Sequence, residues 1–338
     1  MSDPIGVLTS CRAVVGSSAH LRIDDNALQR VAADLAKSKE TREWDADLHY
    51  RATGADGDER TAMWLLVLDA LNFCFWGQGA DQQQRWRVRW KGELVDGYVA
   101  LVAALTTAVQ RGYPLHDANW LAEVSEEDVR DILAPEEQHT EIPLFDDRVR
   151  NLRELGTGLQ SIGTQPATAF IELAEGSAVD LVRRIVSTFP SFNDVTVWPY
   201  GDTGLSGNEV RFYKRAQILV GDLAGGLAGS PLAEFDDLDQ LTAFADYKVP
   251  QILREMGVMV YDQQLAQIVD SRTRIPAGDR MEVEIRAATI VACDMLVQAL
   301  RAHDRHLTAA ELDWHLWSLS QSLGGESRPY HLTETIYY

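Results

Sequence analysis

Two residues of opposite charge, Lys214 and Asp246, stand out because apolar residues surround each of them. Lys214 follows Phe212 and a tyrosine, and Asp246 lies between Phe244 and Tyr247. A carboxylate in apolar surroundings is costly unless it is paired or held for use. The sequence therefore predicts that Asp246 is either a member of a structural ion pair or a group that takes part in chemistry.

Ordinary structural roles are open to both residues. An aspartate just before a helix usually accepts hydrogen bonds from the first free amides. Asp246 precedes Val249 and Gln251 at the start of a predicted helix, so spacing alone favours this capping role. Lys214 precedes a helix predicted to begin near Arg215, where a lysine is ordinarily exposed.

Aromatic residues follow a predicted helix over 59–71. Phe73, Phe75 and Trp76 come at its end. Rings at the end of a helix usually pack into a core. The alternative is that they stack on a flat heterocycle, since aromatic rings provide such surfaces.

The balance of charge restricts the class of ligand. The chain has 338 residues and a formal net charge of −20. Its densest basic segment, 85–91, is short and alternates with tryptophan and valine. Proteins that bind long nucleic acids need a basic stripe, so we expect a small substrate and no direct contact with nucleic acid.

The cysteines and the hydropathy of the chain indicate the cellular compartment that we expect. Cys11, Cys74 and Cys293 form neither a metal motif nor an even disulfide framework, which favours the cytoplasm. No apolar run reaches the ~20 residues of a membrane span, and the first residues do not resemble a secretory signal. The eight histidines are dispersed, so we expect no metal and no cofactor. The oligomeric state is left open.

Helical periodicity dominates the chain, and the predicted fold is mainly α with a small β sheet or ribbon. Residues 1–20 are expected to form an irregular or weakly helical arm. A strand over 85–90 is predicted to pair with a strand near 210, and a strand near 195–197 to pair antiparallel with 209–213. Helices are predicted at 26–37, 59–71, 93–111, 119–124, 125–133, 143–159, 166–175, 177–188, 250–256, 262–270, 279–303 and 308–323.

Composition suggests two parts, with a boundary in the acidic linker and the helix after it. The first, 1–140, is helical. The second, 141–338, carries the small β element and a catalytic helical core. The composition is equally compatible with one compact body.

Several long motifs resemble the queuosine salvage protein family. They are LNFCFW at 71–76, YKRAQI at 213–218, FADYKVPQIL at 244–253, GDRMEVEIR at 278–286 and a final IYY. The matches extend from about residue 44 to the last residue. The resemblance implies hydrolysis of queuosine 5′-monophosphate at its N-glycosidic bond, which releases queuine for tRNA modification. It also implies a helical core similar to that of helix-hairpin-helix DNA glycosylases, which use a lysine and an aspartate.

The resemblance assigns roles to the two charged residues. Asp246 would stabilise the oxocarbenium-like sugar as the base departs. Lys214 would either bind the 5′-phosphate or lower the pKa of Asp246. Queuine is a 7-deazaguanine, so the ring nitrogen that guanine can protonate on leaving is missing. Hydrogen bonds to the base edge then gain importance.

Further residues would bind the rest of the nucleotide. The expected base-binding residues are Asn72, Phe73, Phe75, Trp76 and Asp194. The expected phosphate- or ribose-binding residues are Lys214, Arg215, His49, Tyr247 and Tyr338, the last docked near the pocket with Tyr337.

Glu282 and Glu284 lie two apart on a predicted helix, so they cannot share a face. Arg280 and Arg286 are within helical reach of them, which favours ordinary ion pairs.

Two other functions remain open. One is a nucleic-acid base-excision glycosylase, which the absence of a glycine-rich hairpin for DNA disfavours. The other is a non-catalytic protein that binds queuine or a nucleotide, in which Asp246 would matter only for folding.

Overall fold

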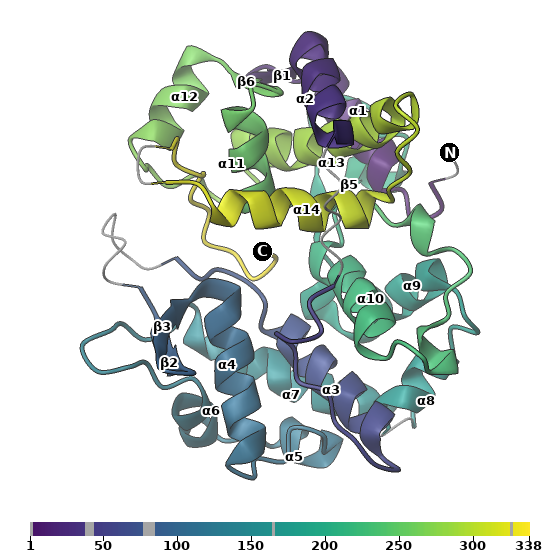
Figure 1. The fold of residues 1–338 in the computed structure, drawn as a ribbon, viewed down its shortest axis with the longest axis vertical. Helices are drawn as coiled ribbons and strands as arrows, with labels where there is room; N and C mark the ends of the chain where they lie inside the picture. Colours follow the sequence, from purple (N-terminus) through teal and green to yellow (C-terminus); the bar gives the residue numbers. More distant parts are fainter. Residues whose placement is uncertain (1–2, 38–43, 77–84, 164–165, 325–326) are drawn as a thin grey trace.

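Helices make up most of the protein in the computed structural model, which describes residues 3–37, 44–76, 85–163, 166–324 and 327–338. Within these ranges the strands occur as three antiparallel pairs. The predicted class, mainly α with small β elements, is therefore confirmed. Figure 1 shows the helices in two groups, with the C-terminal segment between them.

One strand pair joins distant segments of the chain, since β1 (Leu21–Ile23) pairs with β6 (Met259–Tyr261). A second pair joins consecutive strands. β4 (Val195–Val197) pairs with β5 (Glu209–Arg211), with Val195 opposite Arg211, which confirms the predicted pairing.

The third pair corrects a prediction. β2 (Arg87–Trp90) pairs with β3 (Glu93–Asp96) and not with the strand near 210. Lys91 and Gly92 connect these strands, and both have positive φ, 51° and 86°. Positive φ at both central residues is the geometry of the two-residue turn that suits a β-hairpin. The predicted helix over 93–111 therefore begins only at Gly97, where α4 (Gly97–Gln110) starts.

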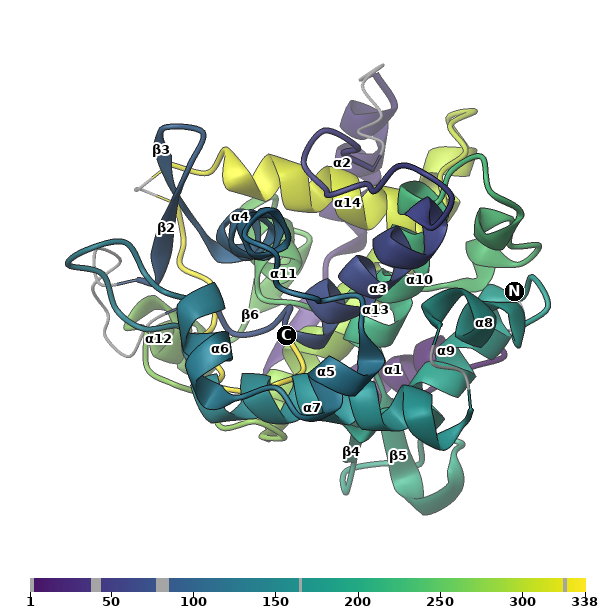
Figure 2. The same cartoon turned by 90° about the horizontal axis from the view of Figure 1, so that it is seen from below.

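The first and largest hydrophobic cluster fills the lower group of helices in Figure 1, which Figure 2 shows from below, and also includes buried side chains within 5–14 and 283–291. Its central element is α3 (Gly57–Ala70), which has no amphipathic face because apolar side chains surround it and nearly all are buried. Its neighbours α7 (Phe145–Ser161) and α10 (Lys214–Gly226) pack beside it. Smaller helices complete this group: α5 (Ala118–Ala122), α6 (Glu126–Ile132), α8 (Ala167–Glu172) and α9 (Ala178–Thr188).

The second hydrophobic cluster surrounds α13 (Arg280–Arg301). Helices that contact α13 include α2 (Asp25–Lys37), α11 (Lys248–Glu255) and α14 (Ala309–Gln321). α12 (Gln263–Asp270) follows β6. The expected arm over 1–20 is wrong in one respect, since α1 (Val7–Gly16) is a regular helix that packs on α13. Its buried Val7, Cys11 and Val14 are spaced at helical period.

A third, small hydrophobic cluster joins the end of α3 to the C-terminal segment. It contains Phe73, Trp76, Tyr330 and Leu332, with Tyr247 packed against it. Short 3-10 helices lie at Pro190–Phe192, Ser206–Asn208, Pro231–Ala233 and Leu238–Gln240. The first cluster contains residues from both sides of residue 140. The division into 1–140 and 141–338 stays a prediction.

Candidate active site

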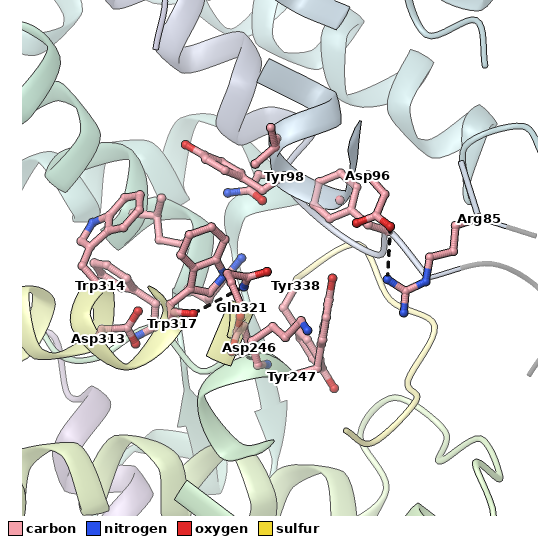
Figure 3. Close-up of a pocket in the computed structure, with 18 residues that line it drawn as sticks. Arg85, Asp96, Tyr98, Asp246, Tyr247, Asp313, Trp314, Trp317, Gln321 and Tyr338 are labelled. Carbon is pink, nitrogen blue, oxygen red and sulfur yellow. Dashed lines mark hydrogen bonds and ion pairs between the residues drawn. The ribbon is translucent and has the colours of Figure 1, made fainter. Parts of the chain in front are cut away.

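A cavity lies where the three hydrophobic clusters meet, and Lys214 and Asp246 both line it (Figure 3). The segments that form it are far apart in the sequence. The lining residues are Asn72, Phe75, Arg85, Asp96, Gly97, Tyr98, Val99, Lys214, Ile218, Phe244, Asp246, Tyr247, Lys248, Asp313, Trp314, Trp317, Gln321 and Tyr338.

Asp246 faces the cavity and also caps a helix. The backbone N–H groups of Lys248 and Val249 both donate to its Oδ1, each over 2.8 Å. Burial raises the pKa of Asp246, while the Lys214 ammonium and these two N–H donors act in the opposite direction. The capping role and the position in the cavity are thus compatible, because one carboxylate oxygen accepts both bonds.

Lys214 is the first residue of α10 and is only 5% exposed. The preceding Tyr213 has φ of 48°, a left-handed conformation that turns the chain from β5 into the helix. Burial lowers the pKa of Lys214, and the carboxylates of Asp246 and Asp69 raise it. The exposed position considered for this lysine is therefore excluded.

Asp313, on α14, is a second carboxyl group of the cavity that sequence reasoning missed. Its Oδ1 accepts a hydrogen bond from the backbone N–H of Phe244 over 2.8 Å. Burial and the nearby negative charge of Asp246 raise its pKa well above the usual value. Two neighbouring carboxyl groups whose environments differ can hold different protonation states, as acid and base groups in active sites do. The sequence signal that could have identified it is its position between Leu312 and Trp314 within a predicted helix.

Aromatic rings form one end of the cavity. Trp317 packs edge to face against Trp314, with ring centroids 5.7 Å apart, and against Tyr98 at 6.0 Å. Figure 3 shows Trp314, Trp317 and Asp313 on the side of the cavity opposite Arg85. These rings were also missed by the sequence analysis, since they lie on α14 and at the start of α4.

The rings predicted to stack on the base have different positions. Phe75 lines the cavity. Phe73 does not line it and lies beneath the guanidinium of Arg148, 4.2 Å from its ring centroid. Trp76 also lies away from the cavity, with Arg274 over its ring at 5.3 Å. Only Phe75 of the three is therefore placed to touch a ligand there.

Of the two polar residues expected to bind the base edge, only one lines the cavity. Asn72 lines the cavity, and its Nδ2 donates to Oδ1 of Asp69 over 3.2 Å. Asp194 lies outside the lining and accepts two hydrogen bonds from Arg286, over 2.9 and 2.5 Å. This buried pair fixes α13 to the segment before β4.

Arg215 is buried next to the cavity wall and does not reach the cavity. It is 1% exposed, and its guanidinium donates to the backbone carbonyls of Asp69, Ala70 and Ser191. Its pKa falls to about 10 because of burial. It thus links α3 to the segment before β4 and does not line the cavity.

His49 holds one wall in place without lining it. Its Nδ1 lies 2.7 Å from the carbonyl oxygen of Asp45, and its Nε2 lies 2.7 Å from the hydroxyl of Tyr98. The ring also stacks on Trp44 with centroids 4.3 Å apart. The Tyr98 hydroxyl in turn donates to Asp222 over 3.3 Å. His49 is therefore placed to orient Tyr98.

Tyr247 and Tyr338 line the cavity, and their binding of phosphate or ribose stays a prediction. The hydroxyl of Tyr338 donates to Oε1 of Glu282 over 2.9 Å, and its backbone oxygen accepts from the N–H of Cys74 over 2.8 Å. Its side chain is 2% exposed. The expected docking of residue 338 near the pocket is confirmed.

The paired glutamates of α13 point in opposite directions. Glu282 contacts Tyr338 and lies 3.7 Å from Arg286. Glu284 pairs with Arg280 at 2.8 Å and accepts bonds from the backbone of residues 19 and 20. Both predicted ion pairs are thus confirmed, and neither glutamate lines the cavity.

In the ranges that the structure describes, no group of three or more His, Cys, Asp or Glu side chains is placed to hold a metal ion. No helix in the same ranges is long and apolar enough to cross a bilayer.

The cavity combines a buried ammonium, a helix-capping carboxylate, an aromatic end and a cationic end with Arg85 and Lys248. A fixed carboxylate beside a sugar, with rings to hold a base, is suited to the cleavage of an N-glycosidic bond. The fold and the site together therefore define a helical protein of the N-glycosyl hydrolase class.

The chain belongs to the queuosine salvage protein family, whose model matches residues 48–338. It is similar to the queuosine 5′-phosphate N-glycosylase/hydrolase of Sphaerobacter thermophilus, with 45% identity over 342 residues and all of both chains covered. Proteins of the same name from Dictyostelium discoideum and Mus musculus are 33% and 32% identical, covering 96% and 100% of this chain and the same shares of their own.

Proposed function

We propose that this protein hydrolyses the N-glycosidic bond of queuosine 5′-phosphate and releases queuine for reuse in tRNA modification. The observation that supports this most directly is Asp246, whose carboxylate is fixed by two backbone N–H groups within a cavity that also contains Lys214. The names of the similar proteins give the substrate.

The reaction breaks the bond between the anomeric carbon and the base nitrogen. The electron pair of that bond leaves with the base, and the ribose becomes an oxocarbenium-like cation. Asp246 stabilises this cation electrostatically. A water molecule then adds to the anomeric carbon, and its proton balances the negative charge on the departing base. The products are queuine and ribose 5-phosphate.

The charges around Asp246 keep it suited to this role. A protonated carboxyl group would not stabilise a cation, and burial favours the protonated form. Lys214 and the two N–H donors oppose that tendency. Lys214 therefore serves to keep Asp246 ionised through its positive charge.

The base is placed at the aromatic end of the cavity. Phe75, Trp314 and Trp317 provide flat surfaces there, and Asn72 and Asp313 provide polar groups for the base edge. These hydrogen bonds stabilise the leaving base, whose ring lacks the protonatable nitrogen of guanine.

Two further parts of the proposal concern the fold and the location. The helical core is proposed to be similar to that of helix-hairpin-helix DNA glycosylases, on the basis of the lysine and aspartate pair. The cytoplasm is proposed as the location, since Cys11, Cys74 and Cys293 are free thiols.

The test is the variant Asp246→Asn, assayed with queuosine 5′-phosphate. We expect normal affinity and a rate lower by at least ~10²-fold, because the amide carries no charge but can still accept hydrogen bonds. Asp262→Asn is the matched control: Asp262 caps α12 in the same way but does not line the cavity. Its activity should equal that of the parent protein.

Other outcomes would support the alternative functions. Unchanged turnover by Asp246→Asn would remove the catalytic role and favour a protein that only binds queuine or a nucleotide. Loss of the circular dichroism spectrum would reduce Asp246 to a helix cap. Activity on a base within a duplex, with none on the nucleotide, would favour a base-excision glycosylase.

A further inference from the structure

We infer that Arg85 and Lys248 bind the 5′-phosphate of the substrate and so determine a preference for the nucleotide over the nucleoside. The inference rests on the proposed function and adds to it the residues that recognise the phosphate. Both cations line the cavity, and the sequence motifs gave no reason to select either.

The position of these cations agrees with the order of groups in a nucleotide. The base is attached at C1′ of the ribose and the 5′-phosphate is carried by C4′ through C5′, so the two groups leave the ring from opposite ends of the C1′–O4′–C4′ edge. Figure 3 shows Asp246 between the tryptophans of α14 and Arg85. With the ribose beside Asp246 and the base beside Trp314 and Trp317, the phosphate must extend toward Arg85. Lys248 lies two residues after Asp246, at the first position of α11.

The two cations at this end have no close carboxylate partner in the described part of the chain. The guanidinium of Arg85 is 3.8 Å from Oδ2 of Asp96, which is longer than a hydrogen bond, and Arg87 approaches the same oxygen at 3.5 Å. The Lys248 ammonium has no carboxylate within 4.0 Å, although Asp246 and Asp96 act on it from farther away. A dianionic phosphate could therefore approach both cations more closely than these carboxylates do.

The side chains of Arg85 and Lys248 both contact Tyr330. Nη2 of Arg85 donates to the Tyr330 hydroxyl over 2.5 Å, and Nζ of Lys248 lies 5.2 Å from the centroid of the same ring. Burial and the charge of Arg85 lower the pKa of Lys248. The Arg85 side chain is only 14% exposed, so its guanidinium group lies in the cavity wall and not on the outer surface.

The chemistry of the two side chains suits a phosphate. A guanidinium can donate two parallel hydrogen bonds to phosphate oxygens, and an ammonium adds a compact charge. Hydrogen bonds to charged groups are the stronger kind, and loss of one such donor should weaken binding by about tenfold or more. The nucleoside, which has no phosphate, would gain nothing from either residue.

The experiment compares kcat/KM for queuosine 5′-monophosphate and for queuosine in Arg85→Gln and Lys248→Met. We expect the ratio of the two values to fall by about tenfold or more in each variant. Arg89→Gln is the matched control, because Arg89 lies in β2, which begins two residues after Arg85, but is exposed and pairs with Glu136 at 3.1 Å. Its ratio should equal that of the parent protein.

A second measurement uses inorganic phosphate as the probe, with the parent protein and Lys248→Met. Phosphate should inhibit the parent protein in competition with the nucleotide, and its inhibition constant should rise about tenfold or more in the variant. This comparison also serves if Arg85→Gln fails to fold.

The inference is overturned if both variants keep the parent ratio, or if the parent protein shows no preference for the nucleotide. Hydrolysis of queuosine 5′-monophosphate by the parent protein would persist in either case, so the proposed function would survive. A parent protein that hydrolyses neither substrate would instead contradict the proposed function itself.

Discussion

Lys214 and Asp246 are each perturbed in the direction that burial dictates, and each limits the perturbation of the other. Burial disfavours the charged form of both groups. It lowers the pKa of the lysine and raises that of the aspartate, while their mutual attraction opposes both shifts. Each charge thus favours the charged form of the other.

The variant Lys214→Met should therefore move the acid limb of the pH–rate profile. Asp246 is active when ionised, so activity is present above its pKa and lost as the pH falls through that value. Its pKa is raised from 3.8. Removal of the ammonium should raise it further, and the acid limb of kcat/KM should shift to higher pH. Profiles of kcat/KM against pH for both proteins measure this.

Lys37→Met is the control for that measurement, because Lys37 is exposed and pairs with Asp34 on the surface. Its profile should match that of the parent protein. An acid limb that stays in place, or moves to lower pH, in Lys214→Met would show that the lysine does not support the charge of Asp246.

The sequence could predict only part of the site at this scale. A charged residue among apolar neighbours is a local signal, and it identified Lys214 and Asp246. Arg85 and Asp313 are brought to the cavity by strand and helix positions far from Asp246, which a local signal does not contain. Arg215 and Asp194 were predicted to touch the substrate, yet their hydrogen bonds are directed to the protein itself.

At the scale of elements, one close contact between helices depends on a glycine. A Cβ added to Gly156, within α7, would lie 2.3 Å from the backbone nitrogen of Ala122 and 2.4 Å from the carbonyl oxygen of Ala118, both in α5. Backbone atoms cannot move aside as a flexible side chain can. The two helices can therefore pack this closely only where α7 has no side chain.

Gly156→Ala should destabilise the protein by ~1–3 kcal/mol, since overpacking outweighs the gain in helix propensity. Urea unfolding of both proteins measures the change. Gly16→Ala is the control, because a Cβ there, in α1, would meet no atom within 4 Å. Its stability should stay within ~1 kcal/mol of the parent value. A Gly156→Ala protein as stable as the parent would contradict the close packing of α5 and α7.

Element prediction succeeded where periodicity was strong. The helices of the C-terminal half and the pairing of β4 with β5 follow the predicted ranges closely. The hairpin of β2 and β3 was missed because the predicted helix began at Glu93 and so included the residues of β3. A lysine in a left-handed conformation has no clear sequence signal, and tertiary packing fixes it here.

The whole molecule combines an acidic charge with one small cationic end in its cavity. The formal net charge of −20 repels polyanions. A mononucleotide brings one phosphate only, so hydrolysis should depend weakly on salt. The slope of log kcat/KM against log salt concentration should not exceed about one in magnitude.

Competition with single-stranded RNA oligomers tests the same property. We expect no inhibition of nucleotide hydrolysis by such oligomers at low salt, where phosphate contacts are strongest. Strong inhibition that disappears as salt is added would indicate a nucleic-acid surface, and a steep salt slope would agree with it. Either result would contradict a substrate limited to one phosphate.

The cavity is bordered by all three hydrophobic clusters, since Tyr98, Trp317 and Tyr247 pack against different ones. A ligand held there touches groups that separate when the chain unfolds, so occupancy and folding are linked equilibria. At one hundred times its dissociation constant, a nucleotide that binds only the folded state adds ~2.7 kcal/mol to the free energy of unfolding. The cellular concentration of this nucleotide would thereby affect how long the protein resists proteolysis.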